Sequence, residues 1–244
     1  MTTSSESDPG TITLVSTPIG NLGDITYRAV EVLRAADVIL AEDTRHSRRL
    51  LDRYEIDKRP ISFHDHNKER VTPRIIERAL AGESIALVTD AGTPGISDPG
   101  FYMVRAAIDA GVTVTTAPGA SAVLPALVMS GLPTNRFTFE GFAPKKKGEL
   151  GRAVAALTEE SRTVIYYVAP HQLLKVLGAF EEHLPERRLA VARELTKIHE
   201  EMTRGTASEL ISHFEGRRVR GEIVLVVSGR AKDRPRRGAA TPLP

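Results

Sequence analysis

The sequence predicts an α/β protein that contains two α/β domains. Short apolar runs typical of buried strands alternate with segments whose apolar residues recur at helical spacing. The apolar runs are continuous, which is typical of strands in a mainly parallel sheet covered by helices on both faces. The pattern changes near residues 136–150, where three lysines follow a strand-like run. We therefore expect domains at 11–138 and 139–230, with disordered ends at 1–10 and 231–244.

In the first domain, a strand and a helix follow each other five times. The predicted strands are residues 11–16, 37–41, 60–63, 84–89 and 112–116. The predicted helices are residues 25–36, 44–54, 72–83, 100–111 and 120–131. Thr72 as N-cap and Pro73 in the first turn mark the start of the third helix, and Gly111 ends the fourth.

The second domain has fewer elements and no sequence repeat of the first. Its predicted strands are residues 137–142, 162–170, 188–194 and 221–229. Its predicted helices are residues 171–180 and 206–216. The segment "APKKKGE" (143–149) is the best candidate for a linker.

Composition excludes several classes of protein. Of the 244 residues, 41% are hydrophobic and 26% are charged, as expected of a folded domain. The chain has no Cys, which excludes disulfides, thiolate metal sites and a cysteine nucleophile, and fits a reducing compartment. No stretch approaches the ~18 uncharged apolar residues of a membrane span. The first ten residues do not resemble a secretory signal, so we expect a cytoplasmic protein that does not associate with membranes.

Charge is distributed unevenly along the chain. The net charge is +2, yet residues 230–244 alone carry five basic side chains and a single acidic one. Local basic clusters on a neutral body are compatible with nucleic-acid binding. The same tail, with its Pro, Gly and Ala, is equally compatible with a solvated end.

Polar residues collect directly after each predicted strand of the first domain. The five segments are "TPIGNLGD" (17–24), "EDTR" (42–45), "HDHNKE" (64–69), "DAGTPGISDPG" (90–100) and "APGAS" (117–121). Ligands of open α/β sheets bind outside the carboxyl ends of the strands, so these segments predict one site at one sheet edge. Neither the dinucleotide fingerprint nor the phosphate-binding loop occurs among them.

The segment 90–100 is the most informative of the five. It holds three Gly, two Pro and two Asp, and it is longer than the two to six residues that a plain connection needs. It contains no Lys or Arg, so it suits a nucleoside-sized ligand with amino-acid polarity better than a polyphosphate. The alternative is an elaborate turn before a helix, with Asp98 acting only near the N-cap.

Taken together, these segments resemble the bacterial 16S rRNA ribose 2′-O-methyltransferase family. The resemblance covers residues 12–228 and rests on "LVSTPIGNLGD", "AEDTR", "FHDHN", "ALVTDAGTPGISDPG", "APGASAVLPALVMSGLPTNRFTFEGFAPKK" and "ARELTKIHEE". It implies a tetrapyrrole-methylase-like fold, with S-adenosylmethionine bound in a cleft between the two domains. It also implies methylation of a decoding-region cytidine (1402) of 16S rRNA in the small ribosomal subunit, by a homodimer that needs no metal. Porphyrin-type members of the wider class differ, since their first loop resembles G-P-G-D-P.

The resemblance implies a set of residues that contact the cofactor. In the first domain these are Pro18, Gly20, Asp90, Gly92, Pro94, Gly95, Ile96, Asp98, Ala120 and Ser121. In the second domain they are Tyr167 and Ala169, at the end of a strand.

The acceptor side has three candidate catalytic residues. Either Asp43 or His64 is expected to take the proton of the ribose hydroxyl, and Arg45 to position a phosphate or the ribose oxygen. The alternative for "EDTR" is an ion pair with a helix N-cap. Two His at i, i+2 without a third ligand make a weak metal site, so no metal is predicted.

Further residues form the predicted contact with RNA. They are Glu42, Arg48, Arg49, Asn67, Lys145, Lys146, Lys147, Arg193 and Lys197. Basic clusters of this kind bind phosphates without sequence preference. The alternatives are a solvated linker for the three lysines and a solvated charged segment for 192–201.

Two other functions remain open on the sequence alone. One is a methylase of a tetrapyrrole or another small acceptor. The other is a non-catalytic RNA-binding module, because "GNLG" (20–23) fits the GxxG loop that clamps an RNA backbone. That loop normally joins two helices, whereas here it follows a strand.

Overall fold

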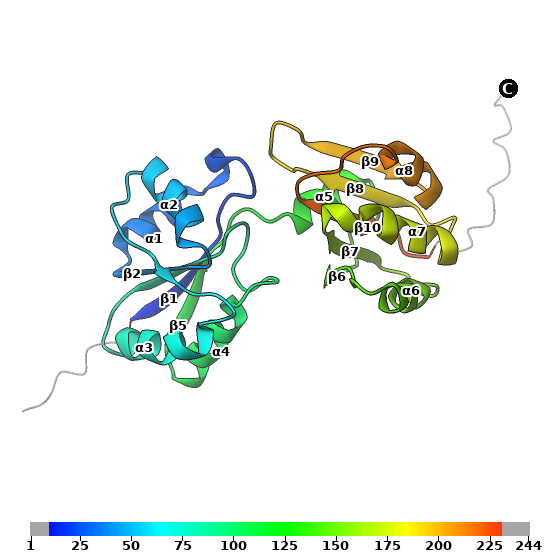
Figure 1. Ribbon diagram of the computed structural model, residues 1–244. Helices are drawn as coiled ribbons and strands as arrows, with labels where there is room; N and C mark the ends of the chain where they lie inside the picture. The colour runs from blue at the N-terminus through cyan, green and yellow to red at the C-terminus, as the bar shows by residue number, and fades with distance from the viewer. Residues whose placement is uncertain (1–9, 231–244) are drawn as a thin grey trace, which may run out of the picture. The chain divides into compact units, whose positions relative to one another are not determined.

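A computed structural model describes residues 10–230 of the chain (Figure 1). The chain divides between Ala122 and Val123 into two compact units, each with its own five-stranded sheet. The disordered ends predicted at 1–10 and 231–244 lie, apart from Gly10, outside the described residues. Within the described part of the chain, no helix is long and apolar enough to cross a membrane.

The first unit is the parallel α/β layer structure that the sequence predicts. Its strands are β1 (Thr11–Val15), β2 (Val38–Ala41), β3 (Ile61–Ser62), β4 (Ile85–Val88) and β5 (Thr113–Ala117). Its helices are η1 (Leu22–Asp24), α1 (Tyr27–Ala35), α2 (Thr44–Arg53), α3 (Lys68–Leu80) and α4 (Gly100–Asp109). The strands pair in the order β3-β2-β4-β1-β5, and every pair is parallel.

Both faces of this sheet are buried, which explains the continuous apolar runs. Ala86 and Val88 of β4 pack in one core with Leu33 of α1. The intervening Ile85 and Leu87 pack in a second core together with side chains of α3 and α4. Figure 1 shows α1 and α2 over one face of the sheet and α3 and α4 over the other.

Helix α3 begins earlier than predicted. It starts at Lys68 after Asn67, so Thr72 and Pro73 lie inside the helix, and they do not mark its first turn. The Asn67 side chain does not cap the helix but folds back onto the preceding loop, where it binds His64 N and Ser62 O. Pro73 is tolerated close to the helix start, where its missing N–H removes one helical bond.

The second unit contains helices on both faces of a mixed sheet. Its strands are β6 (Phe137–Phe142), β7 (Thr163–Val168), β8 (Leu189–Arg193), β9 (Glu201–Gly205) and β10 (Ile223–Val227). Its helices are α5 (Val123–Ser130), α6 (Lys147–Ala155), η2 (Pro170–Gln172), α7 (Leu173–His183) and α8 (Ala207–Phe214). The order is β6-β7-β10-β8-β9, in which β6 and β7 are parallel and the remaining pairs antiparallel. The mainly parallel arrangement therefore holds for the first unit alone.

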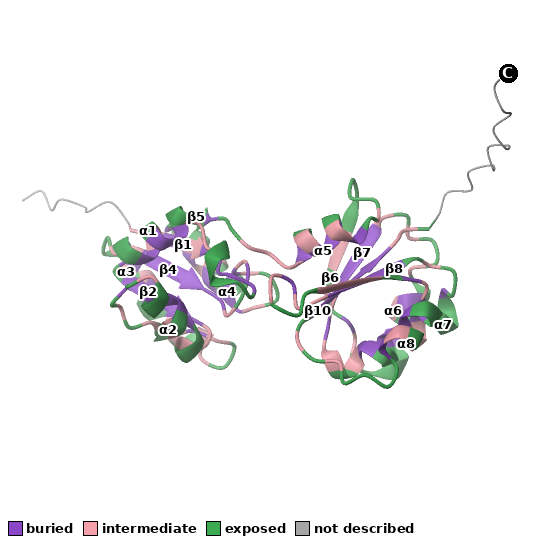
Figure 2. Ribbon diagram, turned by 90° about the horizontal axis from the view of Figure 1, so that it is seen from above, coloured by how far each residue is buried: buried purple, intermediate pink, exposed green. Residues whose placement is uncertain are grey.

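Side chains of α6, α7 and α8 form one core with alternate residues of the strands, such as Val164, Tyr166 and Val168 of β7. Helix α5 packs on β8, β9 and β10. Figure 2 shows it on the side of the sheet opposite α6, α7 and α8.

The boundary and the linker differ from the sequence-based expectation. The division falls at 122/123, earlier than the predicted 138/139, because α5 packs on the second sheet and β6 pairs with β7. The predicted linker 143–149 lies within the second unit, and Lys147 already begins α6. Sequence reasoning missed this helix because its first turn has the charged composition of a linker. Its apolar residues Leu150 and Val154 are buried in the core. Strand β9, "EMTRG", was missed because it is a polar edge strand paired with β8 alone.

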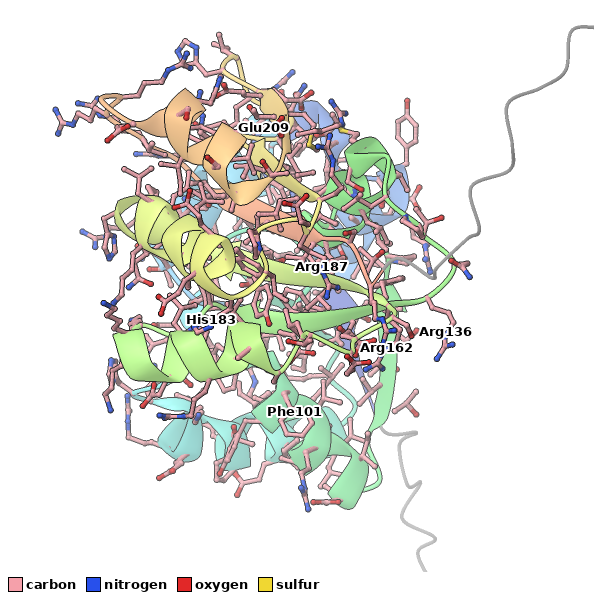
Figure 3. The ribbon with its side chains drawn as sticks, turned by 90° about the vertical axis from the view of Figure 1, so that its right-hand side faces the viewer. Phe101, Arg136, Arg162, His183, Arg187 and Glu209 are labelled. Carbon is pink, nitrogen blue, oxygen red and sulfur yellow. The ribbon has the colours of Figure 1, made fainter. Side chains whose placement is uncertain are left out.

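Arginines stand just before three strands of the second unit. Figure 3 shows Arg136, Arg162 and Arg187 near the starts of β6, β7 and β8. Arg187 donates to four backbone carbonyls, of Leu157 (3.0 Å), Thr158 (3.1 Å), Glu160 (3.3 Å) and Ser228 (3.0 Å). This side chain thus joins the loop before β7 to the residue that follows β10.

We expect Arg187→Met to lower the free energy of unfolding by about 1.5–3 kcal/mol, because hydrogen bonds from a charged donor are lost together. Chemical denaturation measures this change. Arg188→Met is the matched control, since Arg188 is exposed and its guanidinium lies 3.4 Å from a carboxylate oxygen of Glu209. A surface pair of that kind contributes about 0–1 kcal/mol. Equal effects of the two substitutions would contradict the bridging role of Arg187.

Candidate active site

The carboxyl ends of β1 to β5 meet at one edge of the first sheet, because all five strands are parallel. Hydrogen bonds join the loops at this edge. The backbone of Thr17 exchanges two bonds with Gly92, N to O at 2.9 and 3.0 Å. Ser16 Oγ donates to Thr93 Oγ1 (3.3 Å), which donates to the carbonyl of Ala120 (3.3 Å). The loops after β1, β4 and β5 therefore form one connected structure.

The loop after β4 depends on glycine and on Asp98. Gly92 and Gly95 have φ values of +82° and +90°, a region that favours glycine. The Asp98 Oδ1 atom accepts hydrogen bonds from Gly95 N (2.8 Å) and Gly100 N (2.7 Å). A Cβ atom at Gly100 would lie 2.7 Å from Gly95 N, so this close approach also requires glycine. Asp98 thus organises the turn before α4, which was the alternative interpretation of this residue.

The second carboxylate oxygen of Asp98, Oδ2, does not contribute to this turn. Asp98 Oδ2 is buried and has no hydrogen-bond partner within the described residues. A buried carboxylate oxygen without a donor is costly, so it is suited to accept a bond from a polar ligand.

Carboxylates concentrate at the same edge. Thr89 Oγ1, at the end of β4, donates to Glu42 Oε2 (3.0 Å), and Asp43 N donates to Asp90 Oδ1 (3.0 Å). Burial raises the pKa of Glu42, and the negative charges of Asp90 and Asp98 raise it further. The edge therefore combines negative charge with glycine-rich backbone, and Glu42 is a stronger base than an ordinary carboxylate.

Asp43 occupies the N-cap of α2. Its Oδ1 accepts from Arg45 N (2.8 Å) and His46 N (3.3 Å), and Arg45 Nε lies 3.8 Å from the same oxygen. The bond from Arg45 N, followed by that from His46 N, lowers the pKa of Asp43. The ion pair with an N-cap, which was the alternative for "EDTR", is what the structure contains. A carboxylate with a lowered pKa is the weaker base of the neighbouring pair Glu42 and Asp43.

The loop after β3 is held by Asn67. Its Oδ1 accepts from His64 N (2.9 Å), and its Nδ2 donates to Ser62 O (3.0 Å). His64 Nδ1 is buried without a partner in the described structure, and its ring lies 5.8 Å from that of His66. Residues 10–230 contain no group of three or more His, Asp or Glu that could hold a metal ion.

The remaining predicted contacts of the first unit differ in exposure. Gly20 and Ile96 are exposed, and Asp90, Ala120 and Ser121 are partly exposed. Pro18 and Pro94 are buried and contribute to the shape of the loops. Arg49 is exposed, whereas Arg48 pairs with Asp52 at 2.6 Å.

In the second unit, several predicted cations are neutralised by carboxylates. Arg193 Nε lies 2.8 Å from Glu201 Oε2. Lys197 Nζ lies 2.7 Å from Glu194 and 3.1 Å from Glu222, and these bonds raise its pKa against the opposing effect of burial. Phosphates would have to compete with these partners, so Arg193 and Lys197 are weaker candidates for RNA contacts than the sequence suggested.

The predicted residues at the end of β7 have local partners. The Tyr167 ring packs edge-on against Phe139 and Phe142, and Ala169 is the N-cap residue of η2. By contrast, Lys145, Lys146 and Lys147 are exposed. Lys146 Nζ lies 3.3 Å from Glu149.

Sequence reasoning missed the polar residues that connect the loops. Ser16, Thr17 and Thr89 directly follow β1 and β4, and Thr93 lies further along the loop after β4. The hydroxyls of Ser16, Thr89 and Thr93 make the contacts described above, and Thr17 Oγ1 donates to Thr89 O (3.1 Å). Small hydroxyl side chains directly after apolar strand residues were the available signal.

The fold and the site define a class of protein. A family model described as tetrapyrrole (corrin/porphyrin) methylases matches residues 11–211. The crystal structure of a uroporphyrin-III C-methyltransferase from Thermus thermophilus has a TM-score of 0.63 at 23% identity, covering 90% of this chain and 94% of that one. A diphthine synthase structure has a TM-score of 0.67 at 16% identity and covers 90% of each chain. The chain belongs to the tetrapyrrole methylase family, and it is a methyltransferase that uses S-adenosylmethionine.

More similar relatives share one name, ribosomal RNA small subunit methyltransferase I. The relative from Synechocystis is 49% identical, over 93% of this chain and 82% of its own length. Those from Bacillus subtilis and Thermotoga maritima are 46% and 42% identical, over 94% and 91% of this chain and 78% and 99% of their own lengths. The resemblance found in the sequence is thereby confirmed at the level of the family.

The residues of the first unit fit S-adenosylmethionine. The ligand carries an ammonium group, a sulfonium and ribose hydroxyls, and it carries no phosphate. The carboxylates of Asp90 and Asp98, the unpartnered Asp98 Oδ2 and the glycine backbone match these groups. The absence of Lys and Arg from residues 90–100 also agrees.

Proposed function

We propose that the chain methylates the ribose 2′-oxygen of cytidine 1402 of 16S rRNA in the small ribosomal subunit. Glu42, a carboxylate of raised pKa beside the glycine loop after β4, is the observation that carries the assignment of a hydroxyl acceptor. The rRNA acceptor is supported by relatives that are named for small-subunit rRNA and are 42–49% identical to this chain.

The first unit supplies the groups that hold the methyl donor. The backbone of Gly92 and Gly95 and the free oxygen of Asp98 are available for its polar atoms, and Asp90 adds negative charge for its ammonium. When bound, S-adenosylmethionine supplies an electrophilic methyl group on a sulfonium. The contributions of Tyr167 and Ala169, and the cleft expected between the two units, stay predictions.

Glu42 accepts the proton of the ribose hydroxyl as the oxygen attacks the methyl carbon. A free alkoxide therefore does not have to form. A general base of this kind contributes about 10²–10⁴-fold to a rate. Asp43 holds the start of α2, and this fixes the position of Glu42 one residue earlier. Arg45, in the first turn of α2, pairs with Asp43 at 3.8 Å, yet its side chain is 93% exposed and so can also contact a phosphate of the acceptor strand.

The test is transfer of radiolabelled methyl groups to small ribosomal subunits that lack the modification, followed by mapping of the labelled nucleotide. Label on the ribose of cytidine 1402 is the expected result. Label on another nucleotide would overturn the choice of acceptor. Label on a porphyrinogen but not on the subunit would favour the small-acceptor alternative, and RNA binding without any transfer would favour the non-catalytic module.

An enzyme with this substrate works where ribosomes are, in the cytoplasm.

The family resemblance also supports a homodimer. Leu124 and Val128, one turn apart on α5, are 53% and 65% exposed, and an apolar surface of this kind fits a second copy of the chain. We expect sedimentation equilibrium to give twice the chain mass; Leu124→Ser with Val128→Ser is expected to weaken association. A monomeric wild-type chain at micromolar concentration would contradict the dimer.

A further inference from the structure

We propose that an aromatic strip on the second unit, followed by three lysines, binds unpaired nucleotides next to the methylated one. The strip consists of Phe139 and Phe142 on β6 and Tyr167 on β7, and the lysines are 145–147. This inference rests on the proposed RNA acceptor and names the surface that receives its single-stranded part.

A β-bulge creates the strip. The register places Phe139 opposite Ile165 and Phe142 opposite Tyr167, so β6 has one residue more than β7 between these pairs. Gly141, with a φ of +68°, lies in the bulge. In a regular strand, which has no bulge, Phe142 would point to the same face as Thr138 and away from Phe139, because side chains alternate along a strand. With it, the Tyr167 ring lies 4.9 Å from Phe139 and 5.4 Å from Phe142, at interplanar angles of 67° and 62°.

The strip lies on the sheet face that is opposite the main core. Tyr166 and Val168 of β7 point into the core formed with α6, α7 and α8. On the opposite face, α5 packs over β8, β9 and β10 (Figure 2). Phe142 is 59% exposed, although its ring also contacts Tyr167. Such a ring is available to stack on a flat partner.

Positive charge continues directly from the aromatic strip. Lys145, Lys146 and Lys147 begin three residues after Phe142 and are all exposed. Lys175 Nζ donates to the carbonyl of Lys145 (2.6 Å), which brings a fourth ammonium group to the segment. Among these four ammonium groups, that of Lys146 pairs with a carboxylate, Glu149 at 3.3 Å.

An exposed ring on an aromatic strip, beside four exposed ammonium groups of which one pairs with Glu149, matches a ligand with flat bases on an anionic backbone. Proteins recognise unpaired RNA by stacking bases on aromatic side chains of a sheet and contacting its phosphates with cations. Arg193 at the end of β8 and Lys197 in the loop before β9, by contrast, are paired with carboxylates, namely Glu201 for Arg193 and Glu194 and Glu222 for Lys197. The charge balance thus favours the β6–β7 side of the second sheet for the RNA.

The test uses the full-length protein, unmodified small ribosomal subunits and radiolabelled S-adenosylmethionine. Phe142→Ala is expected to raise the KM for the subunit by about 5- to 100-fold, since stacking on one aromatic side chain accounts for such a range. The affinity for S-adenosylmethionine is expected to stay unchanged, and Phe142→Trp is expected to retain the wild-type KM. Ile108→Ala is the matched control, because Ile108 is 62% exposed in the last turn of α4, at the sheet edge opposite the first-unit loops.

Replacing the three lysines by Gln gives a second readout. The plot of log affinity against log salt concentration is expected to lose about 2 from its slope, because each phosphate contact with single-stranded RNA contributes about 0.7. Phe142→Ala is expected to leave this slope unchanged.

The outcomes separate the inference from the proposed function. Wild-type protein that transfers no methyl group to the subunit would remove the proposed function. Active wild-type protein with an unchanged KM in Phe142→Ala, or an unchanged salt slope in the lysine variant, would overturn the aromatic–lysine surface alone. A Phe142→Ala variant that also loses affinity for S-adenosylmethionine would indicate a role in the cofactor site and would contradict the inference as well.

Discussion

Replacing Glu42 with Gln is expected to lower kcat by about 10²–10⁴-fold while the affinity for S-adenosylmethionine changes little. The amide keeps an oxygen that can accept the bond from Thr89 Oγ1, so the end of β2 keeps its hydrogen bond to β4. Only the capacity to take a proton is lost. Single-turnover transfer of labelled methyl groups to small ribosomal subunits measures the effect.

Asp43→Asn and His64→Ala decide between the alternative bases. Asn caps helices as well as Asp, so Asp43→Asn is expected to keep α2 intact and to retain most of the activity. Glu31→Gln, an exposed position on α1, controls for the loss of one negative charge. A large loss of kcat in Asp43→Asn together with an active Glu42→Gln enzyme would assign the base to Asp43.

The raised pKa of Glu42 also predicts how kcat and stability depend on pH. The base works only when it is deprotonated, so kcat is expected to fall as the pH decreases through the raised pKa of Glu42. A folded-state pKa above the unfolded value means that the charged carboxylate costs stability. This cost is absent below the unfolded pKa and fully present above the folded one. Glu42→Gln is therefore expected to keep or increase the thermal stability at neutral pH, whereas a purely structural carboxylate would lose stability on substitution.

The sequence predicted the first unit more completely than the second. Its strands are buried on both faces, so Ile85 to Val88 form an uninterrupted apolar run that periodicity detects. The second sheet is mixed, and its edge strand β9 has polar residues whose pairing with β8 is a long-range property. Helix α6 begins in a lysine run that has the composition of a linker, and only burial of Leu150 and Val154 identifies it as a helix.

The sequence predicted which loops form the candidate site, but not which of their residues act as base, cap or cofactor contact. The order of the parallel strands brings the loops to one edge, which follows from chain topology. The roles depend on which atoms the loops pair. Asp43 and Glu42 are adjacent in sequence, yet the first accepts backbone bonds at the start of α2 and the second is half-buried against Thr89. The N-cap pattern indicates the first environment, which was the alternative interpretation of "EDTR", whereas no pattern of residue types indicates the burial of Glu42.

Replacing Asp98 with Ala is expected to weaken S-adenosylmethionine binding by about 10- to 100-fold. The substitution removes the acceptor of the bonds from Gly95 N and Gly100 N, and bonds to a charged acceptor contribute about 1.5–3 kcal/mol. The loop then loses the conformation in which Gly95 has a φ of +90°. Isothermal titration with the cofactor measures the change without any RNA.

Asp98→Asn separates the shape of the loop from its charge. The amide oxygen still accepts from both backbone N–H groups, whereas the negative charge and the unpartnered Oδ2 are gone. If Asp98 acts mainly by holding the loop, Asn is expected to bind the cofactor much better than Ala does. If its charge attracts the cofactor, Asn and Ala are expected to be equally weak. Asp109→Ala, at an exposed ion pair in the last turn of α4, is the matched control and is expected to bind like the wild type. Unchanged affinity in both Asp98 variants would remove the loop after β4 from the cofactor site, and with it the argument that places the methyl donor beside Glu42.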